Sequence, residues 1–305
     1  MSEMAAGVDP PSDLLAFMTT FRLPAGETPL SLLARYDSLL NAGGPVGRVE
    51  RAVPIAELDG WRLTADVHFP AEAPAPVLLL LHGGGWIMGS PASHERLARE
   101  FAARGFLTVS VDYPRAPRRR FPAGYEGCLA ALRWAGRTAE RFGGDASRLV
   151  VAGDSAGANL AAAIAVSSPA DRPYIRAAAL MYGIYDFHEA LPVLEPLVGG
   201  ADAGTQLYLP PQLFEELAGD PRLSPRHAAA AMPPCWLGVG TADPLLGETQ
   251  ALAAELARVG RPHELYLAPG APHSFLQMPF LAACRSGLDS AAAFLHAGVN
   301  APVSA

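Results

Sequence analysis

Three residues spaced along the chain could together carry out acyl-transfer chemistry: Ser155, Asp243 and His273. Ser155 is the central residue of a GDSAG sequence at 153–157, which follows an apolar run and precedes an alanine-rich segment. This pattern predicts a strand, a sharp turn and a helix, with the serine hydroxyl exposed on the turn. A histidine can take the proton of such a hydroxyl, and a carboxylate can orient the histidine. The five-residue match alone also fits an ordinary glycine-rich turn, so the surrounding sequence must decide between the two interpretations.

A second glycine-rich segment, HGGGW at 82–86, lies directly after the apolar run 77–81. Consecutive glycines allow a backbone that points amide N–H groups at a developing oxyanion. We expect His82 to hold this loop by hydrogen bonds, and Asp154 to order the serine turn rather than to react. The sequence therefore offers an oxyanion-binding element as well as a candidate nucleophile.

The chain from residue 77 onward alternates between strand-like apolar runs and helical patterns, which predicts a parallel sheet. Ser155, Asp243 and His273 each follow the carboxyl end of a predicted strand, where the sites of open α/β sheets form. Beyond 77–81, we expect strands at 106–111, 149–153, 177–182, 235–240 and 264–268, and helices from about 93, at 125–142, after 155, around 252–259 and at 281–295. Residues 61–69 alternate between apolar and polar, which predicts a strand with one face in solvent: Arg62, Thr64, Asp66 and His68.

Two regions do not fit this alternation. Residues 13–21 and 29–40 carry apolar residues at helical spacing ahead of every predicted strand. About forty residues between Asp186 and His227 replace the usual short crossover. We interpret both regions as a lid over the site, although a packed helical decoration without a gating role fits the same pattern.

Composition excludes several classes of function. The 305-residue chain has a formal charge of -7 and a pI near 5.6, which argues against a nucleic-acid partner. It contains no lysine, so neither a Schiff base nor a lysine general base is available. No cluster of His, Cys and Asp has metal-ligand spacing, and no dinucleotide motif is complete, so we expect no metal and no cofactor.

The cellular location is also constrained. Cys128, Cys235 and Cys284 have no paired spacing, which fits buried free thiols in a reducing compartment. Residues 1–11 lack the pattern of a signal peptide, and the longest apolar runs are too short for a membrane span. We therefore expect a cytoplasmic protein.

The sequence resembles the hormone-sensitive-lipase-like family of α/β-hydrolase esterases. The resemblance covers nearly everything from Val77 to Leu295, with motifs at 82–86, 112–123, 153–157, 220–225, 243–245 and His273. It implies an α/β-hydrolase fold: a mostly parallel sheet with an antiparallel N-terminal edge, helices on both faces and a helical cap. The implied division is N-terminal cap helices at 1–46, a core at 47–186 and 228–305, and a cap insertion at 187–227.

The roles that the resemblance implies fall on Ser155 as nucleophile, His273 as base and Asp243 as the carboxylate that orients the base. The implied oxyanion hole consists of the backbone N–H groups of Gly83, Gly84 and Ala156. The implied function is a serine carboxylesterase that hydrolyses short to medium acyl esters of small molecules through an acyl-enzyme. The resemblance also implies a homodimer contact at the C-terminal strand and helix.

The chain departs from the family pattern at two places. Ala158 stands where the serine turn usually continues with a second glycine, which should adjust packing without removing a donor. Arg118 stands where the family has a glutamate, at the start of the run Arg118–Arg120. Such a run is usually a solvated face, although it could attract an anionic substrate.

Several alternatives stay open. The same triad could hydrolyse an amide or a lactone, whereas a non-catalytic ligand-binding receptor on this fold would tolerate loss of His273, which is present here. Asp186 also follows a predicted strand and could replace Asp243 as the acid. The residues predicted to bind substrate are Trp86, Tyr185 and Phe214, with Phe17, Met18, Phe21 and Leu213 as further candidates; ordinary lid packing would equally explain each of them.

Overall fold

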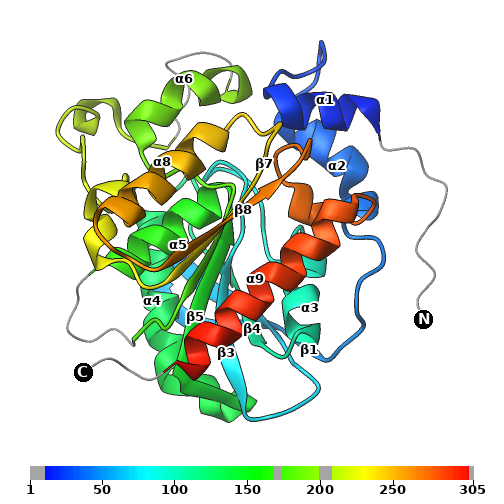
Figure 1. Ribbon diagram of the computed structural model, residues 1–305, viewed down its shortest axis with the longest axis vertical. Coiled ribbons are helices and arrows are strands. Elements are labelled where there is room, and N and C mark those ends of the chain that lie inside the picture. Colours follow the sequence, from blue (N-terminus) through cyan, green and yellow to red (C-terminus); the bar gives the residue numbers. More distant parts are fainter. Residues whose placement is uncertain (1–10, 168–173, 199–207, 302–305) are drawn as a thin grey trace.

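An eight-stranded sheet forms the centre of the computed structural model, which describes residues 11–167, 174–198 and 208–301 (Figure 1). The strands lie in the order β1-β2-β4-β3-β5-β6-β7-β8. Pairing is antiparallel between β1 and β2 and between β2 and β4, and parallel between all later neighbours. Their bounds are β1 Val49–Leu58, β2 Trp61–His68, β3 Ala75–Leu81, β4 Leu107–Asp112, β5 Gly144–Asp154, β6 Ala178–Met181, β7 Cys235–Gly240 and β8 His263–Ala268. The α/β-hydrolase fold with an antiparallel N-terminal edge is thereby confirmed.

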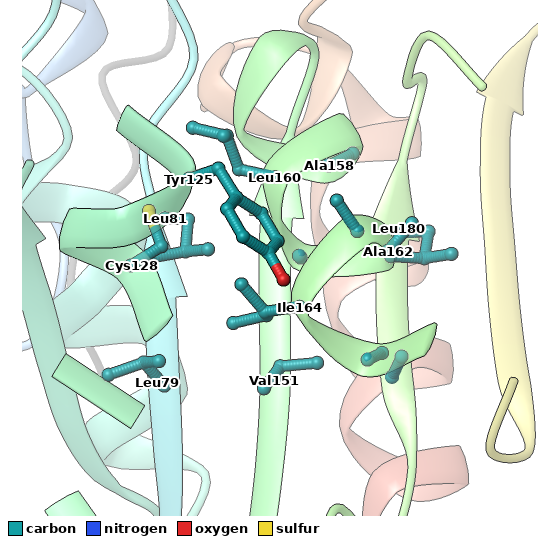
Figure 2. Packing of buried hydrophobic residues seen from close by; sticks show 14 of the residues in the cluster. Leu79, Leu81, Tyr125, Cys128, Val151, Ala158, Leu160, Ala162, Ile164 and Leu180 are labelled. Carbon is teal, nitrogen blue, oxygen red and sulfur yellow. The ribbon is translucent and has the colours of Figure 1, made fainter. Parts of the chain in front are cut away.

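Helices cover both faces of the sheet because its central strands are apolar on both sides. All of β3 is buried, and its side chains alternate between two separate cores. Leu79 and Leu81 pack on the face covered by α4 (Ala123–Thr138), α5 (Ala156–Val166) and α8 (Leu246–Arg258) (Figure 2). Leu78 and Leu80 pack on the face covered by α3 (Glu95–Ala103) and α9 (Ala282–Asn300).

The two helices predicted at the start of the chain are α1 (Ser12–Thr20) and α2 (Pro29–Leu40). Helix α2 begins with a capping box, in which Thr28 and Ser31 exchange side-chain and backbone hydrogen bonds, and has Pro29 at its first position. Both helices lie at the same end of the molecule as α6 (Phe187–Val198), the first element of the predicted insertion (Figure 1). The insertion continues with short 3₁₀ turns at Pro211–Leu213 and Pro225–Ala231, whereas residues 199–207 of the insertion, like residues 1–10, lie outside the described part.

Two expectations about the N-terminal edge need correction. Strand β1 is not among the strands that the sequence pattern predicted. The prediction of a solvated face on β2 is wrong for Asp66 and His68, which are buried. The carboxylate of Asp66 accepts a hydrogen bond from the backbone N–H of Ala52 on β1 at 2.8 Å. Arg51 then bridges Asp66 to Glu95 of α3, so that β1 and α3 together cover this face.

Candidate active site

Ser155 lies on the turn between β5 and α5, with φ 53° and ψ -122°. Such a backbone is rare for a residue with a side chain, and small neighbours are needed to form the turn. A Cβ atom at Gly153 would lie 2.2 Å from the carbonyl oxygen of Gly157, and one at Gly157 would lie 2.0 Å from that of Leu81. Both glycines of the GDSAG sequence are therefore sterically required, and the turn exposes the serine hydroxyl at the carboxyl edge of the sheet.

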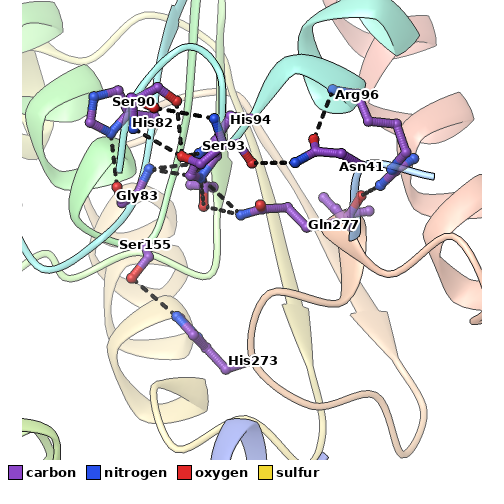
Figure 3. Close-up of polar contacts among 12 residues, drawn as sticks. Asn41, His82, Gly83, Ser90, Ser93, His94, Arg96, Ser155, His273 and Gln277 are labelled. Atoms are coloured by element: carbon purple, nitrogen blue, oxygen red, sulfur yellow. Dashed lines mark hydrogen bonds and ion pairs between the residues drawn. The ribbon is translucent and has the colours of Figure 1, made fainter. Parts of the chain in front are cut away.

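The structure brings Ser155, His273 and Asp243 together. The Nε2 atom of His273 lies 3.0 Å from Oγ of Ser155 (Figure 3). Its Nδ1 atom lies 2.9 Å from Oδ2 of Asp243. Asp243 follows β7 and His273 follows β8, so neighbouring parallel strands deliver the two side chains to one edge. Each of the two residues is only 5% exposed. The second oxygen of Asp243 accepts the N–H of Leu245 at 2.8 Å, which fixes the carboxylate.

Asp186, the alternative acid, is engaged elsewhere. Its Oδ2 lies 2.9 Å from Arg226 and 2.7 Å from Nε2 of His227, and its Oδ1 accepts the N–H of His188 in the first turn of α6. Burial alone would raise the pKa of Asp186, but the N–H of Glu189, the contact with His227 and the charge of Arg226 hold it below its usual value. Asp186 thus ties the two ends of the predicted insertion together and has no bond to His273 among the described contacts.

The glycine loop differs from the prediction at Gly83. Its N–H donates to Oδ1 of Asp154 at 2.8 Å, so it is not available to an oxyanion. Gly84 and Gly85 instead line the same cavity as Ser155. Within the described chain, no acceptor takes their N–H groups. The sequence alone does not show which of three consecutive glycines has a free N–H group. Its only indication that one of them is engaged is the acidic residue beside the serine.

Ala156 is the first residue of α5, so its N–H has no intrahelical acceptor and faces the start of the helix. Such a position also carries the positive end of the helix dipole. Together with Gly84 and Gly85, this N–H can form an anion-binding group beside Ser155. Gly85 is therefore a candidate donor that sequence reasoning missed.

Asp154 is the centre of a buried polar network that joins the glycine loop to the serine turn. Its partners Gly83, His94 and Gln277 are labelled in Figure 3. Besides Gly83, its carboxylate accepts a hydrogen bond from Nε2 of Gln277 at 2.8 Å, and Nε2 of His94 lies 3.3 Å away. His94 is held in turn by Oγ of Ser93, 2.9 Å from its Nδ1. This arrangement agrees with the expectation that Asp154 orders the turn.

His82 holds the other side of the glycine loop. Its Nδ1 lies 2.9 Å from the carbonyl oxygen of Gly83, and its ring stacks on Tyr113 at 4.2 Å. Burial, reinforced by the neighbouring His94, lowers the pKa of His82 well below the usual value, so the ring is neutral. The tyrosine hydroxyl also donates to the carbonyl oxygen of His82 at 2.6 Å. The loop is therefore fixed on both sides before any substrate arrives.

A cavity of about 380 Å³ opens beside Ser155 and His273. Its apolar wall comes mainly from α1, α2 and the residue that follows α1: Phe17, Met18, Phe21, Leu30, Leu33 and Leu40. A larger cavity of about 780 Å³, around residues 45–50 and 68–73, contains no member of the triad. In the described chain, no three His, Cys, Asp or Glu side chains converge as metal ligands, and no helix has the length and apolar character needed to cross a bilayer.

The residues predicted to bind substrate are divided by the structure. Phe17, Met18 and Phe21 line the cavity, whereas Trp86, Tyr185, Phe214 and Leu213 are not among its lining residues. Trp86 stacks on Tyr208 at 4.5 Å, and the hydroxyl of the fully buried Tyr185 accepts the N–H of Gly183. The ring of Phe214 packs on His188 at 4.3 Å. Aromatic packing therefore accounts for Trp86 and Phe214, and burial with a backbone hydrogen bond accounts for Tyr185.

The arginine run also lies away from the cavity. Arg118 and Arg120 are exposed, and Arg119 donates to the backbone carbonyl of Asp59. None of the three lines the cavity beside Ser155. This placement favours the interpretation as a solvated face.

Fold and site together define an α/β hydrolase, in which Ser155 lies on the turn between β5 and α5. A family model described as the alpha/beta hydrolase fold matches residues 78–277, and the chain belongs to this family. It is the family of hormone-sensitive-lipase-like esterases, so the resemblance inferred from the motifs is confirmed.

Solved structures of three esterases are similar to this chain over nearly its whole length. An esterase of Pyrobaculum calidifontis has 25% sequence identity and a TM-score of 0.79, with 95% of this chain and 100% of that chain covered. EstE1, a thermophilic carboxylesterase from a metagenomic library, has 29% identity and a TM-score of 0.77, with 92% and 100% covered. A bacterial heroin esterase has 27% identity and a TM-score of 0.77, with 94% and 97% covered.

Proposed function

We propose that this protein is a serine carboxylesterase that hydrolyses short to medium acyl esters through an acyl-enzyme. The observation that carries the proposal is the hydrogen-bonded series of Ser155, His273 and Asp243 beside an apolar cavity. The names of the three similar structures describe esterases, and this supports ester hydrolysis as the reaction.

The mechanism follows from the position of each group. Ser155 Oγ attacks the ester carbonyl while Nε2 of His273 takes the hydroxyl proton, and Asp243 stabilises the imidazolium that forms. The oxyanion is bound by the N–H groups of Gly84, Gly85 and Ala156, a set revised from the one that the sequence implied. His273 then protonates the leaving alcohol as the carbon–oxygen bond breaks. Water, deprotonated by His273, cleaves the acyl-enzyme and releases the acid and the free serine.

The cavity supports an uncharged substrate of modest size. Its volume of about 380 Å³ and the apolar side chains contributed by α1 and α2 suit an aliphatic or aromatic group rather than a charged one. The glycine loop and the serine turn supply backbone N–H groups beside Ser155, and the polar side chains of Asp37, Ser93 and Gln277 also line the cavity. We therefore assign discrimination by size to the N-terminal helices.

A series of nitrophenyl esters of rising acyl length tests the function. Ser155→Ala should abolish turnover, and Asp243→Asn should lower kcat by about 10⁴-fold, because the base loses the group that fixes its tautomer. Asp186→Asn is the matched control, since it alters a buried carboxylate that has no contact with His273. Turnover that survives Ser155→Ala would refute the proposal, and the reverse order of the two aspartate effects would reassign the acid. Matched nitroanilides and lactones separate ester hydrolysis from amide or lactone hydrolysis.

We also propose three properties of the protein as a whole. α1, α2 and the insertion 187–227 form the cap, supported by the cavity wall that α1 and α2 provide. β8 forms a homodimer contact, supported by its place at the end of the strand order and by Leu265 and Leu267, which are 38% and 41% exposed. The buried free thiols of Cys128, Cys235 and Cys284 support a reducing, cytoplasmic location.

A further inference from the structure

Two aromatic rings enclose the imidazole of His273. Tyr182, which follows β6 in the core, lies 5.1 Å from it with an interplanar angle of 68°. Phe21, which follows α1, lies 5.0 Å from it with an interplanar angle of 86°. Both are edge-to-face contacts within the favourable range for aromatic pairs. The core therefore supplies one side of this enclosure and the N-terminal segment supplies the other.

The backbone of α1 is bonded directly to the backbone of His273. The N–H of His273 donates to the carbonyl oxygen of Met18 at 3.0 Å. Met18 lies in the last turn of α1, where helix carbonyls have no intrahelical donor and need another partner. His273, the candidate base, thus supplies a hydrogen-bond donor to a carbonyl group at the end of α1.

Phe21 is held in a conformation that costs free energy. Its φ of 56° and ψ of 12° place it in the left-handed region, where the Cβ atom of an L-residue is sterically disfavoured. Glycine would avoid this cost at the end of a helix. Phe21 is nevertheless only 2% exposed, and its N–H donates to the carbonyl oxygen of Phe17 at 2.7 Å. The backbone strain is offset by the burial of a ring against His273.

The same two chain segments also share a hydrophobic cluster. Leu14, Phe17 and Met18 of α1 pack with Leu32 of α2 and with Met278, which lies in the loop that begins at His273. A displacement of α1 therefore disturbs the cluster, the hydrogen bond to Met18 and the ring contact together. Helix α1 and the His273 loop behave as one packed unit.

We propose that Phe21 is a positioning residue for His273, so that the N-terminal helix which walls the cavity also orients the general base. The proposal rests on the esterase function proposed above. The bond to Asp243 fixes Nδ1 of the imidazole but leaves rotation of the ring about this contact, and the rings of Phe21 and Tyr182 restrict that rotation.

The test compares Phe21→Leu, Phe21→Tyr and Tyr36→Phe in the full-length protein. Phe21→Leu keeps an apolar side chain but removes the ring, and Phe21→Tyr restores it. Tyr36→Phe removes the 2.7 Å hydrogen bond from Tyr36 to Asp13, which joins α2 to α1 without touching His273. It therefore controls for a general loosening of the N-terminal helices. Two readouts are taken: kcat and KM on a short nitrophenyl ester, and hydrogen exchange of the His273 amide.

We expect Phe21→Leu to lower kcat about tenfold with KM changed less than twofold, since a small misplacement of a catalytic group is costly. The His273 amide should exchange about tenfold faster, and Phe21→Tyr should restore both quantities. An effect of Phe21→Leu on KM alone, or equal effects of Phe21→Leu and Tyr36→Phe on kcat, would overturn the proposal. Exchange at His273 unchanged by Phe21→Leu would also overturn it, independently of activity. Turnover that persists in Ser155→Ala would instead refute the esterase function itself.

Discussion

Asp154→Asn should damage the oxyanion-binding loop while leaving the triad residues unchanged. In the folded protein the carboxylate accepts two hydrogen bonds of 2.8 Å, one from the N–H of Gly83 and one from Nε2 of Gln277. An asparagine side chain has nearly the same shape, but it replaces one acceptor oxygen with an NH₂ donor. If its oxygen stays on Gly83, its amino group faces the amino group of Gln277.

The expected magnitude follows from these contacts. A hydrogen bond to a charged group contributes about 1.5–3 kcal/mol and a neutral one about 0.5–1.5 kcal/mol, so two weakened bonds cost about 2 kcal/mol. For a chain of this size that corresponds to a fall in Tm of roughly 3 °C. Losing a complete oxyanion donor costs about 2.7–4 kcal/mol in the barrier. Because Asp154 holds Gly84 and Gly85 only through Gly83, we expect a partial loss, about tenfold in kcat.

Thermal unfolding and steady-state kinetics on a nitrophenyl ester measure the two effects, and Asp66→Asn is the matched control. Asp66 is also a buried carboxylate that accepts a backbone N–H, from Ala52 at 2.8 Å, and an arginine N–H, from Arg51 at 3.1 Å. It does not line the cavity, so Asp66→Asn should lower Tm by a similar amount and leave kcat unchanged. An Asp154→Asn variant with wild-type kcat, or with kcat lowered no more than in Asp66→Asn, would refute the reasoning.

Three further predictions use other parts of the molecule. Burial lowers the pKa of His68 from 6.5 to about 4, so the unfolded chain binds more protons than the folded one between these values and stability falls as the pH drops. Urea unfolding at pH 7 and at pH 5 measures how much the free energy of unfolding falls between the two values. This fall should be about 2 kcal/mol smaller in His68→Leu than in the wild type, and an equal fall in both proteins would contradict the prediction. Leu267→Arg on the exposed edge of β8 should convert a dimer to a monomer in light scattering, whereas a wild-type monomer would refute the β8 contact. For esters too large for the cavity, we expect a lower kcat as well as a higher KM, because displacement of α1 also removes its contacts with His273. A change in KM alone would contradict this link between α1 and His273.

The parallel direction of the central strands and the meeting of Ser155, Asp243 and His273 could be predicted from the sequence for a physical reason. Continuous apolar runs such as 77–81 identify buried parallel strands, and parallel strands place their carboxyl ends at one edge. Residues that follow separate strands, such as Ser155 and His273, therefore approach each other even though they are far apart in the chain. This inference needs only the direction of the strands and not their detailed packing.

The parts that could not be predicted depend on packing and on individual hydrogen bonds. The pairing of β1 with β2 shifts register between Glu50 and Val53 and again between Pro54 and Ala56, so its side chains lose the alternation by which a strand is recognised. Gly83 and Gly85 are equivalent in the sequence, and only the bond from Gly83 to Asp154 distinguishes them.

Trp86 has the composition expected of a pocket residue, but its stacking on Tyr208 uses a contact between distant parts of the chain. No periodicity in the sequence reports such a contact. The opposite case is Phe21, whose place on the cavity wall depends on a left-handed backbone after α1 that the helical pattern at 13–21 does not indicate.

One short segment joins the separate supports of the site. His273 is the proposed base, Gln277 holds Asp154 and thereby the glycine loop, and Met278 packs against α1. The 3₁₀ turn η4 (Phe275–Gln277) connects these residues and follows Ser274, whose φ is 59°, so the segment is compact and has little freedom to adjust one contact without the others. Base position, oxyanion loop and cavity wall are therefore coupled through six consecutive residues. Because of this coupling, a substitution in α1 that alters which substrate sizes are accepted should also alter the reaction rate through His273.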